Sequence, residues 1–209
     1  MIRYLVKDNF LEGDFFENLK SESMSAYNPE GKNSRSHFDI PENLMTSPSM
    51  IRFKEEISGS KDFWKSVCSQ LNVDVDVESI FTDYQEQDSG AYEEKGNKIL
   101  YSRVDLGYGL KGYGVVNGGR GLHIDNPNRV ISCLLYLCDQ KDFIGGEFEA
   151  CKSDGSVLEK IELKNNRCIL SVQDEFGWHR VNPLTDLLSN SPRVAIYFAL
   201  SANYKYWDR

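Results

Sequence analysis

The sequence predicts a mainly β protein with N-terminal helices and a double-stranded β-helix core, the cupin-like jelly roll. From about residue 98 onward, short segments rich in β-branched and aromatic residues alternate with turns that contain Gly, Asn and Pro. Ahead of residue 98, apolar residues recur at helical spacing instead. Many short strands at regular spacing indicate a sandwich or barrel, most simply a jelly roll. For 209 residues we expect a single domain, 1–209.

The composition excludes disorder and disfavours several kinds of partner. Hydrophobic residues make up 40% of the chain and aromatic residues 12%, enough for a substantial core. Acidic residues outnumber basic ones by 32 to 24, so we expect neither a nucleic acid nor a membrane as a partner. The N-terminus lacks the apolar stretch of a signal peptide, and the five cysteines form no C-x-x-C pair. We therefore expect free thiols in a reducing compartment, the cytoplasm.

Residues 1–97 are expected to form a helical and irregular support for the core. The apolar side chains of residues 10–19 and of residues 61–71 recur at helical spacing, which predicts two helices. Between them, residues 21–49 are rich in Ser, Asn and Pro, which predicts a long loop of the kind that serves as a lid or binding loop. Residues 74–94 carry eight acids and no bases, typical of a solvated loop.

Seven strands are expected in the core, residues 98–209, because β-rich segments there are bounded by turn residues. They are Leu110–Val116, Val130–Cys138, Glu147–Cys151, Val157–Leu163, Arg167–Val172, His179–Val181 and Arg193–Ser201. 

The last predicted strand has two contrasting faces, since side chains alternate along an extended backbone. One face is purely apolar and is expected to pack against the N-terminal helices: Val194, Ile196, Phe198 and Leu200. The other combines small residues with one arginine: Arg193, Ala195, Tyr197 and Ala199. The second face is typical of a cavity lining with a charge at its mouth.

Only three histidines occur, and two of them begin an H-x-D tripeptide. His123 and Asp125 follow a predicted strand and a Gly-rich turn, and side chains at i and i+2 of an extended segment point the same way. With His179, at the start of another predicted strand, they supply the two imidazoles and one carboxylate that suit non-heme Fe(II). The other tripeptide, His37–Asp39, lies in the predicted loop and is not expected to bind metal. On the cavity face, Arg193 can hold a carboxylate through a two-point contact.

The order of these motifs resembles the catalytic core of the Fe(II)/2-oxoglutarate-dependent dioxygenases, and among them the prolyl 4-hydroxylase-like branch. The resemblance spans about residues 101–202, and the ordered set is specific although no single member is. The matching segments are His123–Asn128, Leu134–Leu137, Gly145–Phe148, Gly177–Val181 and Pro192–Ala195. In that family the core is a double-stranded β-helix, which agrees with the strand pattern.

The resemblance implies roles for six residues. The catalytic iron ligands are His123, Asp125 and His179, and Arg193 pairs with the distal carboxylate of 2-oxoglutarate. The pocket for 2-oxoglutarate is lined by tyrosines in the family, and the positions that match are Tyr113 and Tyr136, although either residue could be a core aromatic. 

One position departs from the family pattern. The second residue after the arginine is often Ser or Thr but is Ala195 here. One hydrogen bond to the 2-oxoglutarate carboxylate is therefore expected to be missing or supplied elsewhere.

The implied reaction uses Fe(II), 2-oxoglutarate and O₂, and the resemblance also admits ascorbate. An unactivated C–H bond is hydroxylated while 2-oxoglutarate becomes succinate and CO₂. Related halogenases have Gly or Ala at the position of Asp125, which frees a metal site for chloride, so halogenation is disfavoured here. Three arginines lie near the motifs: Arg120, Arg129 and Arg180. At least two of them are expected to be solvated surface residues.

The substrate is open at this level. The family branch suggests a prolyl or other peptide or protein side chain, which needs an open groove beside the iron. The same chemistry on a free small molecule, such as an amino acid, a sugar-linked intermediate or a secondary metabolite, needs a closed pocket. A non-catalytic metal-binding jelly-roll module is disfavoured, because a structural site has no use for open coordination positions.

Overall fold

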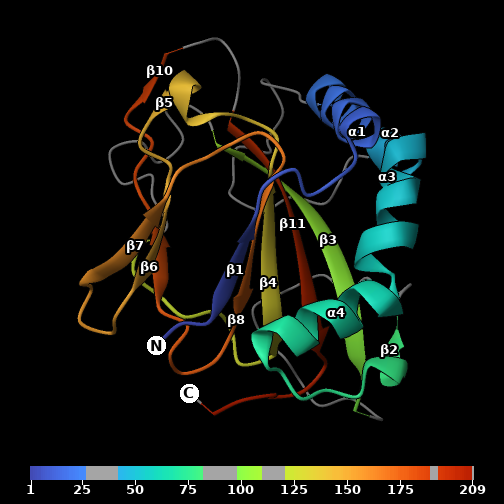
Figure 1. The fold of residues 1–209 in the computed structure, drawn as a ribbon, viewed down its shortest axis with the longest axis vertical. Helices are drawn as coiled ribbons and strands as arrows, with labels where there is room; N and C mark the ends of the chain where they lie inside the picture. The colour runs from blue at the N-terminus through green and yellow to red at the C-terminus, as the bar shows by residue number, and fades with distance from the viewer. Residues whose placement is uncertain (27–41, 82–97, 110–120, 189–192, 209) are drawn as a thin grey trace.

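We describe a computed structural model of the chain, and the description covers residues 1–26, 42–81, 98–109, 121–188 and 193–208 (Figure 1). The strands form one six-stranded, one three-stranded and one two-stranded sheet. In spatial order, the six-stranded sheet consists of β1 (Tyr4–Lys7), β8 (Arg167–Val172), β4 (Arg129–Tyr136), β11 (Arg193–Ala202), β3 (Leu100–Gly109) and β2 (Ile80–Phe81). The three-stranded sheet consists of β7 (Val157–Ile161), β6 (Phe148–Cys151) and β9 (His179–Val181). The two-stranded sheet consists of β10 (Asp186–Leu187) and β5 (Phe143–Ile144).

The strand pairing is that of a double-stranded β-helix, as predicted. Neighbouring strands are antiparallel throughout, apart from the short β2, which runs parallel to β3. The chain passes repeatedly between the large and the three-stranded sheet, so that these two sheets face each other (Figure 1). An inner apolar cluster fills the space between them, and its members include Tyr136, Phe148, Ala150, Ile169 and Ala195.

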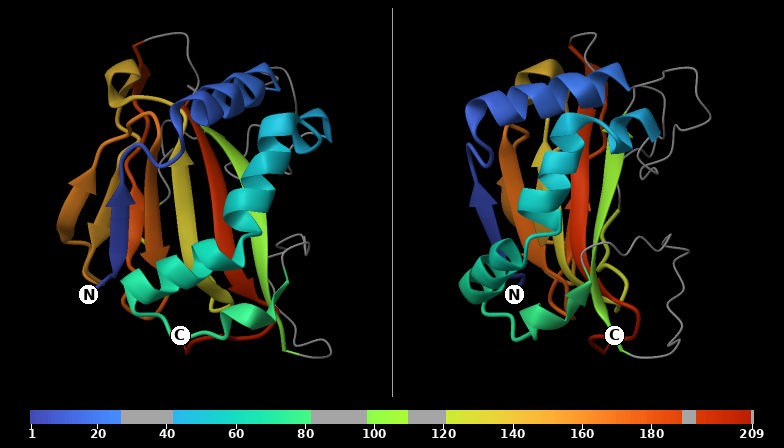
Figure 2. Two further views of the ribbon diagram at one scale, coloured as in Figure 1. Left: turned by 45° about the vertical axis from the view of Figure 1, so that its right-hand side comes forward. Right: turned by 90° about the vertical axis from the view of Figure 1, so that its right-hand side faces the viewer.

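The outer face of the large sheet is covered by the N-terminal helices, as expected from the alternation in β11 (Figure 2). These are α1 (Gly13–Ser25), α2 (Glu42–Met45), α3 (Pro48–Phe53), the π-helix η1 (Lys54–Ser58) and α4 (Lys61–Leu71). Phe198 of β11 is fully buried, and its ring lies 5.3 Å from that of Phe53 and 6.1 Å from that of Trp64. Burial of such aromatic side chains attaches the helical layer to the sheet.

The expectation of a loop over residues 21–49 is wrong at both of its ends. Helix α1 continues to Ser25, and α2 and α3 begin at Glu42 and Pro48. The polar residues of this segment serve as caps: the Glu22 carboxylate accepts from the Ser47 hydroxyl at 2.6 Å and from the Ser49 backbone at 3.1 Å, and Ser47 caps the Met50 N–H. Residues 27–41, with His37–Asp39 and the candidate lid, lie outside the described residues.

Six of the seven predicted strands are confirmed as β4, β6, β7, β8, β9 and β11. The seventh, residues 110–116, lies outside the described part of the chain. Strands β3 and β1 were not predicted. Strand β1 pairs with β8 across more than 160 residues of chain, with Tyr4 opposite Ser171. A four-residue edge strand leaves too short a pattern to distinguish from a loop. The short elements β2, β5, β10, η2 (Val77–Ser79) and η3 (Gln140–Asp142) were not predicted either.

The five cysteines are all buried free thiols, as expected. Burial raises the pKa of the Cys68 and Cys138 thiols to about 11, so both remain protonated and unreactive near neutral pH. Among the described residues, no helix is long and apolar enough to cross a membrane.

Candidate metal centre

Two histidines from distant parts of the chain meet across an antiparallel bridge. The backbone N–H of His123 donates to the His179 carbonyl at 3.0 Å, and the reverse bond is also 3.0 Å. On its other side, His179 lies opposite Ala150 of β6, so His123 extends the three-stranded sheet by one residue. The two imidazole rings lie on the same face, with centroids 4.3 Å apart.

Each imidazole is held in a ring orientation that suits metal binding. Nδ1 of His123 lies 2.6 Å from the Gly121 carbonyl oxygen, and Nδ1 of His179 lies 2.8 Å from that of Gly177. A carbonyl only accepts, so each Nδ1 carries the proton and each Nε2 keeps its lone pair. Nε2 of His123 is buried and has no hydrogen-bond partner among the described residues. A bare, buried lone pair of this kind fits a metal ion.

Asp125 completes the cluster. Its carboxylate is buried, and Oδ1 lies 3.6 Å from Nε2 of His123. One ligand atom from each of His123, Asp125 and His179 falls within 4.8 Å of the others. Two imidazoles and one carboxylate on one side of a metal ion are the set that suits Fe(II) and leaves other positions open. The structure therefore brings together the three residues that the sequence pattern singled out.

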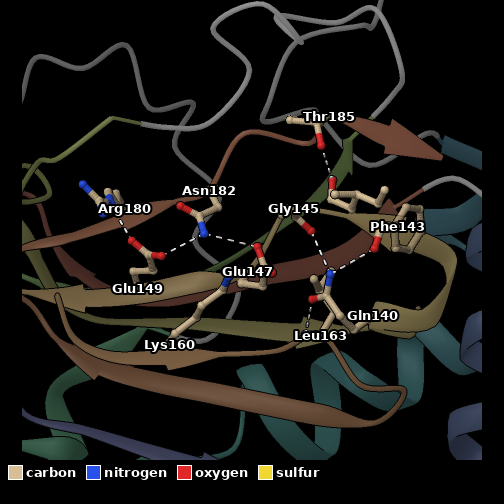
Figure 3. A network of polar contacts seen from close by, with 12 residues as sticks. Gln140, Phe143, Gly145, Glu147, Glu149, Lys160, Leu163, Arg180, Asn182 and Thr185 are labelled. Atoms are coloured by element: carbon tan, nitrogen blue, oxygen red, sulfur yellow. Dashed lines mark hydrogen bonds and ion pairs between the residues drawn. The ribbon is translucent and has the colours of Figure 1, made fainter. Parts of the chain in front are cut away.

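Packing and a polar network fix the strand that carries His179. Inside the barrel, the Phe148 ring stacks on the His179 ring with centroids 5.4 Å apart. On the opposite face of β6, Glu149 accepts from Arg180 at 2.5 Å and from Asn182 at 2.8 Å (Figure 3). Asn182 also reaches Glu147, which is paired with Lys160. Charge-assisted bonds across two strands limit the movement of β9.

A second group of polar atoms lies at the start of β11. The guanidinium carbon of Arg193 lies 5.4 Å from the centre of the Tyr136 ring, and Nη2 donates to the Gly146 carbonyl at 3.0 Å. Nε of Arg193 and the hydroxyl of Tyr136 are buried without hydrogen-bond partners among the described residues. Burial raises the pKa of Tyr136 to about 12, so its hydroxyl stays a donor. The unpartnered Nε–H of a cation and an unpartnered hydroxyl donor close to each other fit a carboxylate ligand.

The Gly145-Gly146 turn makes room for this arginine. Both glycines have positive φ angles, 85° and 83°. A Cβ on Gly145 would lie 1.8 Å from the Pro183 carbonyl oxygen, and one on Gly146 would lie 3.1 Å from Arg193 Nε. Gln140 holds the turn by donating to the Gly145 carbonyl at 2.9 Å (Figure 3). The glycines are thus required both for the turn and for the close approach of the side chain.

The remaining sequence expectations divide into three cases. Tyr113 and Arg120 lie outside the described residues. Arg180 is partly exposed and paired, in agreement with a surface role. Arg129 is the exception that this expectation allowed: the residue is 5% exposed, and its guanidinium donates to the Ser201 hydroxyl at 2.7 Å. Ser132, which contacts Asp125, was not predicted as part of the site. The available signal was a lone serine in the apolar run of β4.

Comparison with known proteins agrees with this site. Residues 108–200, a little under half of the chain, match the family model described as the 2OG-Fe(II) oxygenase superfamily. No curated protein matches the sequence significantly.

Similar solved structures include a prolyl hydroxylase from Trichoplax adhaerens in complex with a hypoxia inducible factor peptide fragment (18% identity, TM-score 0.58, covering 97% of this chain and 85% of that one). A prolyl-4-hydroxylase from Pseudomonas putida has 13% identity and a TM-score of 0.55 over 96% of this chain and 93% of that one. The viral collagen prolyl hydroxylase of Paramecium Bursaria Chlorella virus-1 has 12% identity and a TM-score of 0.52, covering 95% of each chain.

A double-stranded β-helix that brings together two histidines and an aspartate, with an arginine at the start of β11, is the arrangement typical of 2-oxoglutarate-dependent non-heme iron dioxygenases. Residues 108–200 of this core match the model of the 2OG-Fe(II) oxygenase superfamily, and the fold is similar to that of prolyl 4-hydroxylases. The protein is therefore an enzyme that uses Fe(II), 2-oxoglutarate and O₂.

Proposed function

We propose that the protein hydroxylates an unactivated C–H bond in a prolyl or other peptide or protein side chain. The observation that carries the proposal is the convergence of His123, Asp125 and His179 inside a barrel that also holds Arg193, whose Nε atom is buried. In this proposal the three residues hold Fe(II), and Arg193 with Tyr136 holds 2-oxoglutarate. When bound, the iron supplies the activation of O₂ that oxidises 2-oxoglutarate and the substrate together.

The residues of the chain determine how the co-substrate lies. Arg193 offers its unsatisfied Nε to the distal carboxylate of 2-oxoglutarate, and Tyr136 offers its hydroxyl. Tyr136 lies directly opposite Ala195 in the sheet. In this proposal, its hydroxyl takes the role of the Ser or Thr that the family often has at the position of Ala195. The apolar inner cluster around these groups excludes water, which strengthens both contacts.

A peptide substrate is supported by the identity of the proteins that share this fold. Three similar structures are those of prolyl hydroxylases, and that from Trichoplax adhaerens is in complex with a peptide fragment. At 12–18% identity these likenesses define the fold. The substrate class is therefore the part of the proposal that an experiment must decide.

The experiment is a screen for substrate-dependent succinate formation by the Fe(II)-loaded enzyme. Proline-containing peptide pools are compared with pools of free amino acids, sugar-linked metabolites and secondary metabolites, and products are examined by mass spectrometry. We expect a peptide that gains one oxygen atom in step with succinate, and no such product from the His123→Ala variant. Coupled turnover of a small molecule, with no active peptide pool, would overturn the peptide proposal and leave the iron chemistry standing.

A further inference from the structure

We propose that Tyr197 and Ser132 form a buried hydrogen-bond chain that positions Asp125 to bind the metal through one oxygen atom only. This inference rests on the proposed function, because it concerns how the candidate iron ligand is held. Neither Tyr197 nor Ser132 belongs to the metal-ligand cluster itself. Both are therefore positioning residues.

The chain runs across two neighbouring strands. Ser132 of β4 lies 2.8 Å from Oδ2 of Asp125, measured from its hydroxyl oxygen, and 2.9 Å from the hydroxyl of Tyr197 on β11. The relative exposures of Asp125, Ser132 and Tyr197 are 6%, 6% and 7%. Ser132 faces Ala199 in the sheet register, so Tyr197 reaches it diagonally from two residues away.

The chemistry of the three groups fixes the direction of the chain. An ionised carboxylate only accepts hydrogen bonds, so the Ser132 hydroxyl donates its single proton to Asp125. Its oxygen can then only accept from Tyr197, whose phenol is the donor. Donation from Tyr197 polarises the Ser132 hydroxyl and strengthens its bond to the carboxylate.

The consequence falls on the metal site. Oδ2 of Asp125 is engaged by Ser132, whereas Oδ1 lies on the side of His123, 3.6 Å from its Nε2. A carboxylate held in this way presents one oxygen to the metal. Without Ser132, the carboxylate can rotate and present both oxygens, filling a coordination position that the co-substrate or O₂ needs.

Tyr197 is itself held in place from the outside. The guanidinium of Arg129 lies 5.6 Å from the centre of the Tyr197 ring, a cation–π arrangement. The backbone carbonyl of Arg129 accepts from the Trp207 indole at 2.9 Å, so the C-terminal segment is attached to the start of β4. A continuous series of contacts therefore leads from Trp207 to Asp125. It passes through Arg129, then Tyr197, then Ser132.

The test uses Co(II) as a probe with the full-length, metal-free protein. The variants are Ser132→Ala, Ser132→Thr, Tyr197→Phe and the double variant Ser132→Ala/Tyr197→Phe. Ser171→Ala is the matched control: Ser171 is buried directly opposite Ser132, but its hydroxyl donates to the Ser132 backbone carbonyl at 3.2 Å. Co(II) affinity is measured by titration, and the d–d absorption bands report the coordination number.

We expect Ser132→Ala to lower Co(II) affinity about 10- to 100-fold and to change the absorption bands. Tyr197→Phe is expected to have the same effect in a smaller amount, while Ser132→Thr and Ser171→Ala keep wild-type affinity and spectrum. Because Tyr197 acts through Ser132, adding Tyr197→Phe to Ser132→Ala should change nothing further.

Two results would overturn the inference: unchanged affinity and spectrum in Tyr197→Phe, or additive losses in the double variant. If Ser132→Ala does not fold, Tyr197→Phe measured against Ser132→Thr decides alone. These failures are distinct from failure of the metal site itself, in which His123→Ala would leave Co(II) binding intact. They are also distinct from failure of the peptide proposal, in which only a small molecule is turned over.

Discussion

His123 and His179 are joined through their backbones, each donating its N–H to the carbonyl of the other at 3.0 Å. This pair of bonds sets the separation of the two imidazoles before any metal arrives. The carbonyls of Gly121 and Gly177 then fix the orientation of each ring. A site assembled from backbone hydrogen bonds is preorganised, so metal binding needs little rearrangement of the chain.

The choice between the two H-x-D tripeptides can be tested by metal content. His123→Ala or Asp125→Ala is expected to abolish iron binding and turnover, because each removes one of three ligands. His37→Ala is the matched control and should retain one iron per chain. Iron per protein, measured by elemental analysis after gel filtration, decides between them. Loss of iron in His37→Ala and its retention in His123→Ala would show that the wrong tripeptide was chosen.

Arg193 is expected to determine the affinity for 2-oxoglutarate. Removal of one partner of a buried charge pair costs about 2–5 kcal/mol, so Arg193→Ala should raise the apparent KM for 2-oxoglutarate at least about 30-fold. Iron content should remain unchanged, because the arginine lies outside the metal-ligand cluster. The KM of Arg193→Lys for 2-oxoglutarate should lie between those of the wild type and Arg193→Ala, since lysine keeps the charge and loses the planar fork. An unaltered 2-oxoglutarate requirement in Arg193→Ala would refute this role.

A comparison of Gly146→Ala with Gly155→Ala distinguishes the effect of backbone strain from the effect of crowding Arg193. Both have positive φ angles, 83° and 86°, so an alanine at either position should cost about 1–2 kcal/mol of folding stability. Only at Gly146 would the new methyl group press on Arg193, with Cδ 3.2 Å away; at Gly155 the nearest atom is 3.5 Å away, on Leu122. We expect Gly146→Ala alone to raise the KM for 2-oxoglutarate. Equal kinetics for the two variants would contradict the proposed contact.

Asp8 is expected to contribute to acid stability. Hydrogen bonds from Arg167, at 2.6 and 3.1 Å, and from Lys164 hold the pKa of its carboxyl well below the usual range. The stabilisation is therefore complete above the ordinary aspartate pKa of about 4, and it is lost as the pH falls below that value. Asp8→Asn should cost about 0.5–1 kcal/mol at neutral pH, and the difference from wild type should shrink in acid. Denaturant unfolding at several pH values measures it; a difference independent of pH would contradict it.

Asp125 is expected to make the enzyme a hydroxylase even in the presence of halide. By the resemblance to the dioxygenases, Asp125 would fill the coordination position that chloride takes in related halogenases, and Ser132 holds its carboxylate. Turnover in excess chloride should therefore give hydroxylated and no chlorinated product by mass spectrometry. A chlorinated product from the wild-type enzyme would show that Asp125 does not occupy that coordination position.

The strands and the candidate ligands were largely predictable from the sequence, because both are recorded in local patterns. Strand alternation in residues 193–201 assigned one face to the helices and the other to the cavity, and the structure agrees. Helical spacing placed α4 correctly over Lys61–Leu71. The order of H-x-D, G-G, H and R identified the site, because these residues converge in the fold independently of the length and sequence of the loops between them.

Other features depend on contacts between distant segments and leave no local pattern. Strand β1 is defined by pairing with β8, and the serines of residues 47–49 become caps only because Glu22 lies beside them. Ser132 and Tyr197 are unremarkable strand residues until the register of β4 and β11 brings their hydroxyls to 2.9 Å. Sequence by itself thus determined which groups could do the chemistry. Only the tertiary structure decided which hydrogen bonds hold them, since these bonds depend on distances between strands that the chain brings together on folding.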